Sequence, residues 1–265
     1  MNAVHFENEA SSVRLKTLLF TKTLGGYFMQ AIVETVFDAC YLIGVVTLGI
    51  LMIAKSHGNK QYRLFGIMAV VLGFGDAFHL VPRAVALCTT GLDNFAVALG
   101  TGKFITSITM TVFYIILYYI WRIRYHVKGK NIYTIFVYGM AIARIVLCLF
   151  PQNAWTSSAS PLSWGIYRNI PFTIMGLIII YLFYKSSREQ NDKLFKNMWL
   201  TIVISFGFYL PVVLFADLVP IIGMLMIPKT LAYVWTVWIG YHAMKAEQEL
   251  SLIHISEPTR PEPIS

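Results

Sequence analysis

Ionisable side chains lie inside long apolar stretches of this chain, where a charge is costly and usually marks a functional site. The densest group is in segment 75–83, in which Asp76, His79 and Arg83 follow one another at spacings of three and four residues. On a helix, this spacing places all three side chains on one face. A carboxyl, an imidazole and a guanidinium group on one face can move protons and hold an anion, so we predict a site here.

Further charged residues lie in other apolar stretches, and a charge at mid-bilayer depth costs about 2.5 kcal/mol or more. We therefore expect these side chains to turn away from lipid into one shared polar cavity. The residues expected to be catalytic are Asp76, Asp217 and His79. Those expected to bind the substrate are Glu34, Asp38, Arg83, Arg144, Arg168 and Lys229. The alternative is that these groups form ion pairs that only fix how the helices pack.

Seven apolar stretches must position these residues, and each is long enough to cross a bilayer as a helix. Composition agrees, because 57% of the residues are hydrophobic, the mean hydropathy is +0.64 and only 13% are charged. The sequence predicts an all-α, multi-pass membrane protein, with one helical bundle over residues 28–249. The predicted spans are 28–54, 64–85, 100–121, 132–150, 166–184, 198–217 and 222–244.

The distribution of Lys and Arg predicts the orientation, since basic short loops stay in the cytoplasm. The first, third and fifth connections are rich in Lys and Arg, whereas 86–99 and 151–165 carry none. The N-terminus is then outside and the C-terminus inside, although Arg14, Lys16 and Lys22 run against this pattern. The net charge of +8 is explained by this topology, and no nucleic-acid partner is expected.

Both ends of the chain are set apart from the bundle. Residues 1–27 lack the pattern of a cleaved signal and are compatible with a short interfacial helix. Residues 250–265 begin with LSLIHISEPTR, which looks like the translation of a sequencing adapter. We treat this segment as an artefact. It leaves open whether the natural chain continues beyond Glu249 into a further domain.

Several other chemistries find little support in the sequence. His79 is the one histidine expected in the cavity, which is too few for a histidine zinc site, although a carboxylate-rich metal site of Asp76, His79 and Asp217 stays open. Lys229 begins its span rather than lying at the middle, which disfavours a retinal Schiff base. The GxSxG, P-loop and HExxH patterns are absent from the sequence. We expect neither a metal nor a cofactor.

Two motifs resemble a known family. The string GDAFHLVPR at 75–83 is similar to the GDAxxLxPR stretch of bacterial YhhN-type lysoplasmalogenases, and FADL at 215–218 is similar to their later FSDxL pattern. The chain departs from the family in its seven predicted spans instead of eight, in His79, and in Ala216 at the position of the usual serine.

The resemblance implies hydrolysis of the vinyl ether bond of a lyso-lipid in a bacterial cell membrane. That reaction suits one carboxylic acid and one carboxylate, which the resemblance places at Asp76 and Asp217. The competing hypothesis is a seven-helix receptor or sensor that binds a small anionic ligand from the outer face. A transporter is a third hypothesis, although it predicts polar residues in the inner half as well, where only His242 is found.

Overall fold

The computed structural model describes residues 29, 31–89, 91–129, 132–157, 160–216 and 218–256. In this part of the chain, seven helices are long and apolar enough to cross a membrane, and no residue lies in a strand. The predicted all-helical, multi-pass architecture is confirmed. The helices are a first span Ala31–Ala54, α2 Lys60–Cys88, α3 Ala96–Arg124, α4 Ile132–Leu149, α5 Leu162–Glu189, α6 Met198–Phe215 and α7 Met226–Ser256.

Most helices are longer than the apolar runs that predicted them, because helical hydrogen bonding continues into the polar flanks. At the start of α2, for example, the side chain of Asn59 accepts a hydrogen bond from the backbone N–H of Gln61 at 2.9 Å. Sequence reasoning missed three short 3₁₀ helices in the connections, which are η1 Leu92–Phe95, η2 Pro151–Asn153 and η3 Pro220–Leu225. The predicted interfacial segment 1–27 and the catalytic candidate Asp217 lie outside the described residues.

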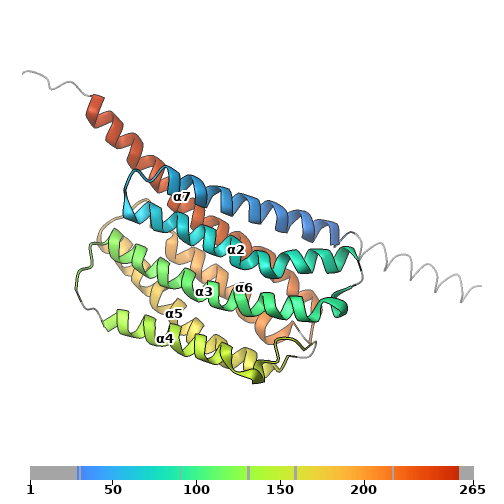
Figure 1. Ribbon diagram of the computed structural model, residues 1–265. Coiled ribbons are helices and arrows are strands. Elements are labelled where there is room, and N and C mark those ends of the chain that lie inside the picture. The colour runs from blue at the N-terminus through green and yellow to red at the C-terminus, as the bar shows by residue number, and fades with distance from the viewer. Residues whose placement is uncertain are drawn as a thin grey trace, which may run out of the picture.

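Helices α2 and α3 run side by side (Figure 1) and pack more extensively than any other pair that the structure describes. Glycine allows their backbones to approach closely. A Cβ atom on Gly75 would lie 2.0 Å from Oγ1 of Thr109, and one on Gly102 would lie 2.2 Å from the carbonyl oxygen of Phe78. This close pair forms the wall on which His79 and Arg83 are placed.

An aromatic core joins α3, α5 and α6. The ring of Tyr114 lies 5.0 Å from that of Phe172 and 5.6 Å from that of Phe206, measured between centroids, and all three rings are buried. Their edge-to-face and tilted arrangement is the geometry that aromatic quadrupoles prefer. Because Phe172 also lines the cavity described below, this core fixes one wall of the site.

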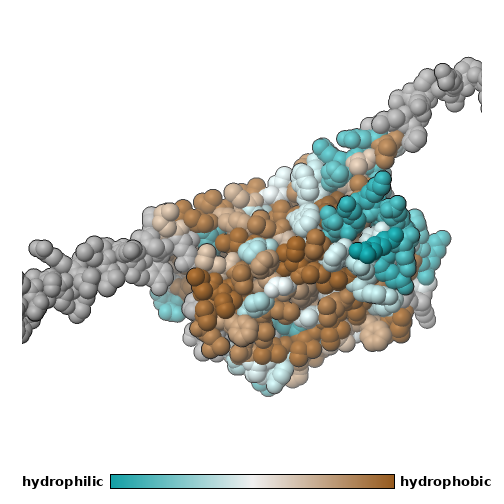
Figure 2. Space-filling view, turned by 180° about the vertical axis from the view of Figure 1, so that it is seen from behind, coloured by the Kyte–Doolittle hydropathy of each residue, from teal (hydrophilic) through white to brown (hydrophobic). Residues whose placement is uncertain are grey.

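Polar side chains gather at the end of the molecule from which α7 leaves the bundle, while apolar side chains cover much of the remaining face (Figure 2). There Arg124 of α3 donates hydrogen bonds of 2.8 and 3.0 Å to the carboxylate of Asp192, and it also pairs with Glu247 of α7. This cluster ties α3, the α5–α6 connection and α7 together, at the end opposite η1, η2 and η3.

Candidate functional site

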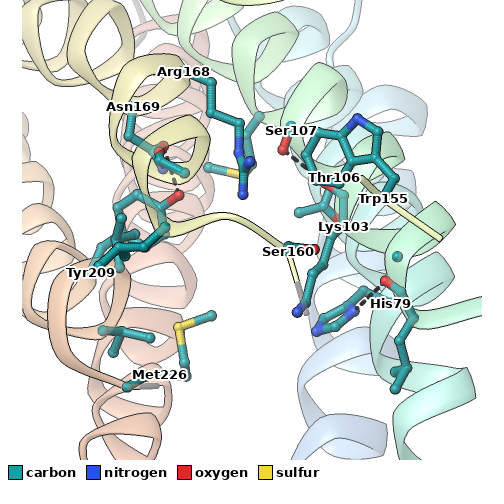
Figure 3. A pocket seen from close by; sticks show the side chains of 18 of the residues that line it. His79, Lys103, Thr106, Ser107, Trp155, Ser160, Arg168, Asn169, Tyr209 and Met226 are labelled. Carbon is teal, nitrogen blue, oxygen red and sulfur yellow. Dashed lines mark hydrogen bonds between the residues drawn. The ribbon is translucent and has the colours of Figure 1, made fainter. Parts of the chain in front are cut away.

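A cavity of about 760 Å³ lies between the helices, at the end that carries η1, η2 and η3. This volume is in the usual range of ligand sites. Figure 3 shows His79 and Lys103 on one wall and Arg168, Asn169 and Tyr209 on the facing wall. The polar lining residues are His79, Arg83, Asp93, Lys103, Thr106, Ser107, Arg144, Ser157, Ser160, Arg168, Asn169, Tyr209, Lys229 and Tyr233.

The lining is strongly cationic. Among the described residues that line it, five are Lys or Arg and one, Asp93, is acidic. Asp93 belongs to η1 in the α2–α3 connection and is exposed, so it does little to neutralise the deeper cations. A concave, partly desolvated site with this excess of positive charge attracts anions.

Arg144 is the most buried cation of the cavity, with 2% of its surface exposed. Its guanidinium carbon lies 3.4 Å from the centroid of the Phe172 ring. Atoms Nε and Nη1 make no hydrogen bond, and no described carboxylate lies within 4.0 Å. Burying an unpaired charge costs several kcal/mol. We therefore expect the charge of Arg144 to destabilise the bundle unless an anion compensates it.

Lys229 lies between the cationic cavity and the acidic residues of α2. It is 8% exposed, and its ammonium nitrogen lies 4.8 Å from the Tyr209 ring centroid and 5.5 Å from that of Tyr233. It interacts electrostatically with both Asp76 and Arg144. The ammonium nitrogen of Lys229 does not come within 4.0 Å of a carboxylate oxygen of Asp76, so the two residues form no ion pair. Lys229 begins its predicted span, and the structure places it in the first turn of α7, where it is buried.

Arg168 holds the connection that closes the cavity. Its Nη1 atom donates a 2.9 Å hydrogen bond to Oδ1 of Asn153, and its guanidinium group lies over the Trp155 ring at 4.4 Å. The indole N–H of Trp155 donates in turn to the carbonyl oxygen of Cys148 at 2.9 Å. Arg168 thus faces the cavity but is already used to anchor residues 153–155.

The predicted acidic residues of the first span and α2 lie in a separate cluster. Glu34 forms a 2.6 Å ion pair with Arg83, and the Tyr41 hydroxyl donates a 2.7 Å hydrogen bond to Oδ2 of Asp76. Asp38 is buried nearby and interacts electrostatically with Glu34, Arg83 and Asp76. Glu34, Asp38 and Asp76 are not among the residues that line the cavity. The structure therefore divides the predicted site residues between an acidic cluster and a cationic cavity, with Arg83 and Lys229 adjoining both.

His79 does line the cavity, and its Nδ1 atom lies 3.3 Å from the carbonyl oxygen of Leu99. Because a carbonyl can only accept, Nδ1 carries the proton in this contact. His242, which the sequence placed near the opposite end, is exposed on α7. The structure does not describe Asp217, so the aspartate pair Asp76–Asp217 stays a prediction.

Sequence reasoning missed three polar partners at the site. Tyr41 follows Glu34 and Asp38 at helical spacing on the same face, and this pattern would have revealed it. Tyr209 donates a 2.8 Å hydrogen bond to Asn169, whose amide N–H donates to the carbonyl of Gly165. No motif marks the pair of Tyr209 and Asn169, because the two residues lie on different helices and no spacing in the sequence relates them.

Comparison with protein-family models, with curated proteins and with solved structures finds no match to this chain. The likeness of segment 75–83 to lysoplasmalogenases stays a prediction from the sequence motifs.

Proposed function

We propose that the protein is a membrane-embedded hydrolase that cleaves the vinyl ether bond of a lyso-lipid, in the manner of lysoplasmalogenases. The observation that carries the proposal is the electrostatic interaction of Asp76 with Lys229, which lines a cationic cavity within seven apolar helices. Such a cavity suits a ligand with an anionic headgroup and an apolar chain.

The chemistry requires two carboxyl groups in different protonation states. A protonated carboxyl group transfers its proton to the vinyl ether carbon and leaves an oxocarbenium ion. Water, deprotonated by a carboxylate, adds to that ion, and the hemiacetal then collapses to a fatty aldehyde and a free glycerol hydroxyl group. We assign these roles to Asp76 and Asp217 without ordering them. We assign His79 to assist proton transfer, because it follows Asp76 by three residues on the same face of α2.

We also propose that the N-terminus lies outside and the C-terminus inside the cytoplasmic membrane of a bacterium. The basic connections after the first, third and fifth spans support this orientation. In that orientation the cavity opens toward the outer face, and a lyso-lipid would enter from the outer leaflet.

The test is product release from lyso-lipids with vinyl ether, alkyl ether or ester linkages, using the purified full chain. Aldehyde should appear from the vinyl ether alone, and Asp76→Asn or Asp217→Asn should abolish it without unfolding the protein. Glu189→Gln, on the exposed end of α5, is the matched control and should retain activity. Unchanged aldehyde release from Asp76→Asn would refute the proposal.

A second candidate is a receptor, sensor or transporter for a small anionic ligand. The observation that favours it is the division of the site, since Asp76 accepts a hydrogen bond from Tyr41 outside the cavity lining, whereas the unpaired Arg144 lies within it. Ligand binding without turnover of any lyso-lipid would support this candidate instead.

A further inference from the structure

Two arginines of this bundle are buried to a large extent, and they differ in whether carboxylates compensate their charge. Arg124 is largely buried and pairs with the carboxylates of Asp192 and Glu247, so its charge is compensated within the protein. Arg144 is more deeply buried, yet two of its nitrogen atoms make no hydrogen bond and no described carboxylate lies within 4.0 Å. Within the part of the chain that the structure describes, no carboxylate compensates the charge of Arg144.

The surroundings of Arg144 hold its guanidinium group in place. Phe172 covers one face of the group at 3.4 Å, and stacking of this kind leaves the N–H bonds, which lie in the guanidinium plane, available for an acceptor. Because α4 carries Arg144 and α5 carries Phe172, the position is set by the packing of two helices. A pre-positioned cation of this kind loses little entropy when it binds an anion.

The charge of the cavity indicates which anion it would take. Arg83 is neutralised by Glu34, and Arg168 is engaged with Asn153 and Trp155. Arg144 and Lys229 are both buried and line the same cavity, and neither forms an ion pair with a carboxylate of the described residues. Two cations match a phosphate group, which carries up to two charges and offers several acceptor oxygens, better than a single carboxylate.

We propose that Arg144 and Lys229 bind a phosphate group inside the bundle, either as free phosphate or as the headgroup phosphate of a single-chain lipid. The lipid source rests on the proposed hydrolase function, whereas phosphate binding itself does not. The Phe172 ring orients Arg144, and the faces of Tyr209 and Tyr233 confine the ammonium group of Lys229.

The experiment measures the melting temperature of the full chain in an alkyl maltoside detergent, which contains no phosphate. The probes are inorganic phosphate, glycerol 3-phosphate and a lysophosphatidic acid, with sodium chloride at equal ionic strength as the reference. The wild-type melting temperature should rise to a plateau with phosphate and not with chloride. If the lysophosphatidic acid saturates at a far lower concentration than glycerol phosphate, the source is a lipid. If the two titrations have similar midpoint concentrations, the source is free phosphate. Either result supports the phosphate site.

Arg144→Met and Arg124→Met form a matched pair of variants. Arg144→Met should melt at the same or a higher temperature than the wild type without ligand, because it removes an unpaired buried charge. It should also lose the phosphate response. Arg124→Met should melt at a lower temperature and keep the response. Lys229→Met and Arg144→Lys should each raise the midpoint concentration about tenfold or more.

Three results would overturn the inference. They are no response of the wild type to any phosphate probe, an undiminished response of Arg144→Met, and a fall in melting temperature of Arg144→Met as large as that of Arg124→Met. The hydrolase proposal fails separately. Phosphate binding without aldehyde release removes the hydrolase alone. Aldehyde release that is unaffected by Arg144→Met removes the lipid headgroup as the source of the phosphate, and the phosphate response of the melting temperature then decides the site by itself.

Discussion

The guanidinium group of Arg144 lies over the ring of Phe172, with its central carbon 3.4 Å from the ring centroid. This contact joins α4 to α5 deep in the bundle. A cation over an aromatic face in a desolvated site contributes about 2 kcal/mol. That is less than the several kcal/mol lost by burying the charge, so Phe172 reduces the cost of Arg144 but does not remove it.

Phe172→Leu should weaken phosphate binding several-fold, because Leu keeps the site apolar but removes the ring that orients Arg144. Phe113→Leu is a matched control, since Phe113 is equally buried but packs against Tyr114 and Tyr233 instead of an arginine. Both changes should destabilise the protein by about 1–3 kcal/mol. Phosphate titration followed by melting temperature separates them, and an equal loss of affinity in both variants would contradict the role given to Phe172.

Tyr41→Phe tests the acidic cluster between the first span and α2. Tyr41 is 4% exposed, and its hydroxyl donates at 2.7 Å to Asp76. Removing this donor leaves a carboxyl oxygen of Asp76 without its partner, and we expect a loss of about 1–3 kcal/mol in the free energy of unfolding. Tyr167→Phe, at an exposed tyrosine, should change stability by less than about 0.5 kcal/mol. Combining Tyr41→Phe with Asp76→Asn should cost less than the sum of the two, and full additivity would exclude the coupling.

The number of spans could be read from the sequence, because a bilayer demands about 20 apolar residues per helix. The rotation of each helix could not. The spans are apolar on nearly every side, so no polar face defines which neighbour a given residue meets. Asp76 shares a helix face with His79 and Arg83, yet it contacts Tyr41 while the other two line the cavity.

The cationic character of the site could be predicted only in part. Arg144, Arg168 and Lys229 were expected to face a cavity, and all three line it. Arg168 anchors the connection after α4 through its contacts with Asn153 and Trp155. This role could not be predicted, because both partners lie in a connection without charge or periodic pattern. Short 3₁₀ segments such as η2 leave no hydrophobic repeat to detect.

The pair Arg124–Asp192 predicts a loss of stability in acid. Burial alone would raise the pKa of Asp192, but its hydrogen bonds and charge attraction to Arg124 outweigh burial and hold the pKa below the ordinary 3.8. The unfolded chain then binds a proton more readily than the folded one. The stabilisation is complete above the unfolded pKa and is lost as the pH falls through the folded pKa.

Thermal unfolding between about pH 2 and 7 measures this effect. Asp192→Asn should lower the melting temperature by a constant amount above about pH 5, and the gap to the wild type should close below about pH 4. Glu189→Gln removes a more exposed partner of Lys185 and should follow the wild-type curve throughout. A gap between wild type and Asp192→Asn that persists at the lowest pH would show that Asp192 acts through packing instead of charge.

Gly100→Ala tests the closure of the cavity. A Cβ atom at Gly100 would lie 1.4 Å from the carbonyl oxygen of Trp155, so the connection after α4 must move away from α3. We expect destabilisation of about 1–3 kcal/mol and faster backbone hydrogen exchange in 151–157. Gly139→Ala is the matched control, because nothing lies within 4 Å of a Cβ atom there and alanine favours helix. It should leave stability unchanged or slightly raised.

Gly100→Ala should also affect phosphate binding, because the guanidinium carbon of Arg168 lies 4.4 Å from the centroid of the Trp155 ring. The substitution should release that guanidinium group and alter the midpoint concentration of the phosphate titration, whereas Gly139→Ala should not. Equal exchange rates in the two variants would show that this connection does not depend on Gly100 for its position over the cavity.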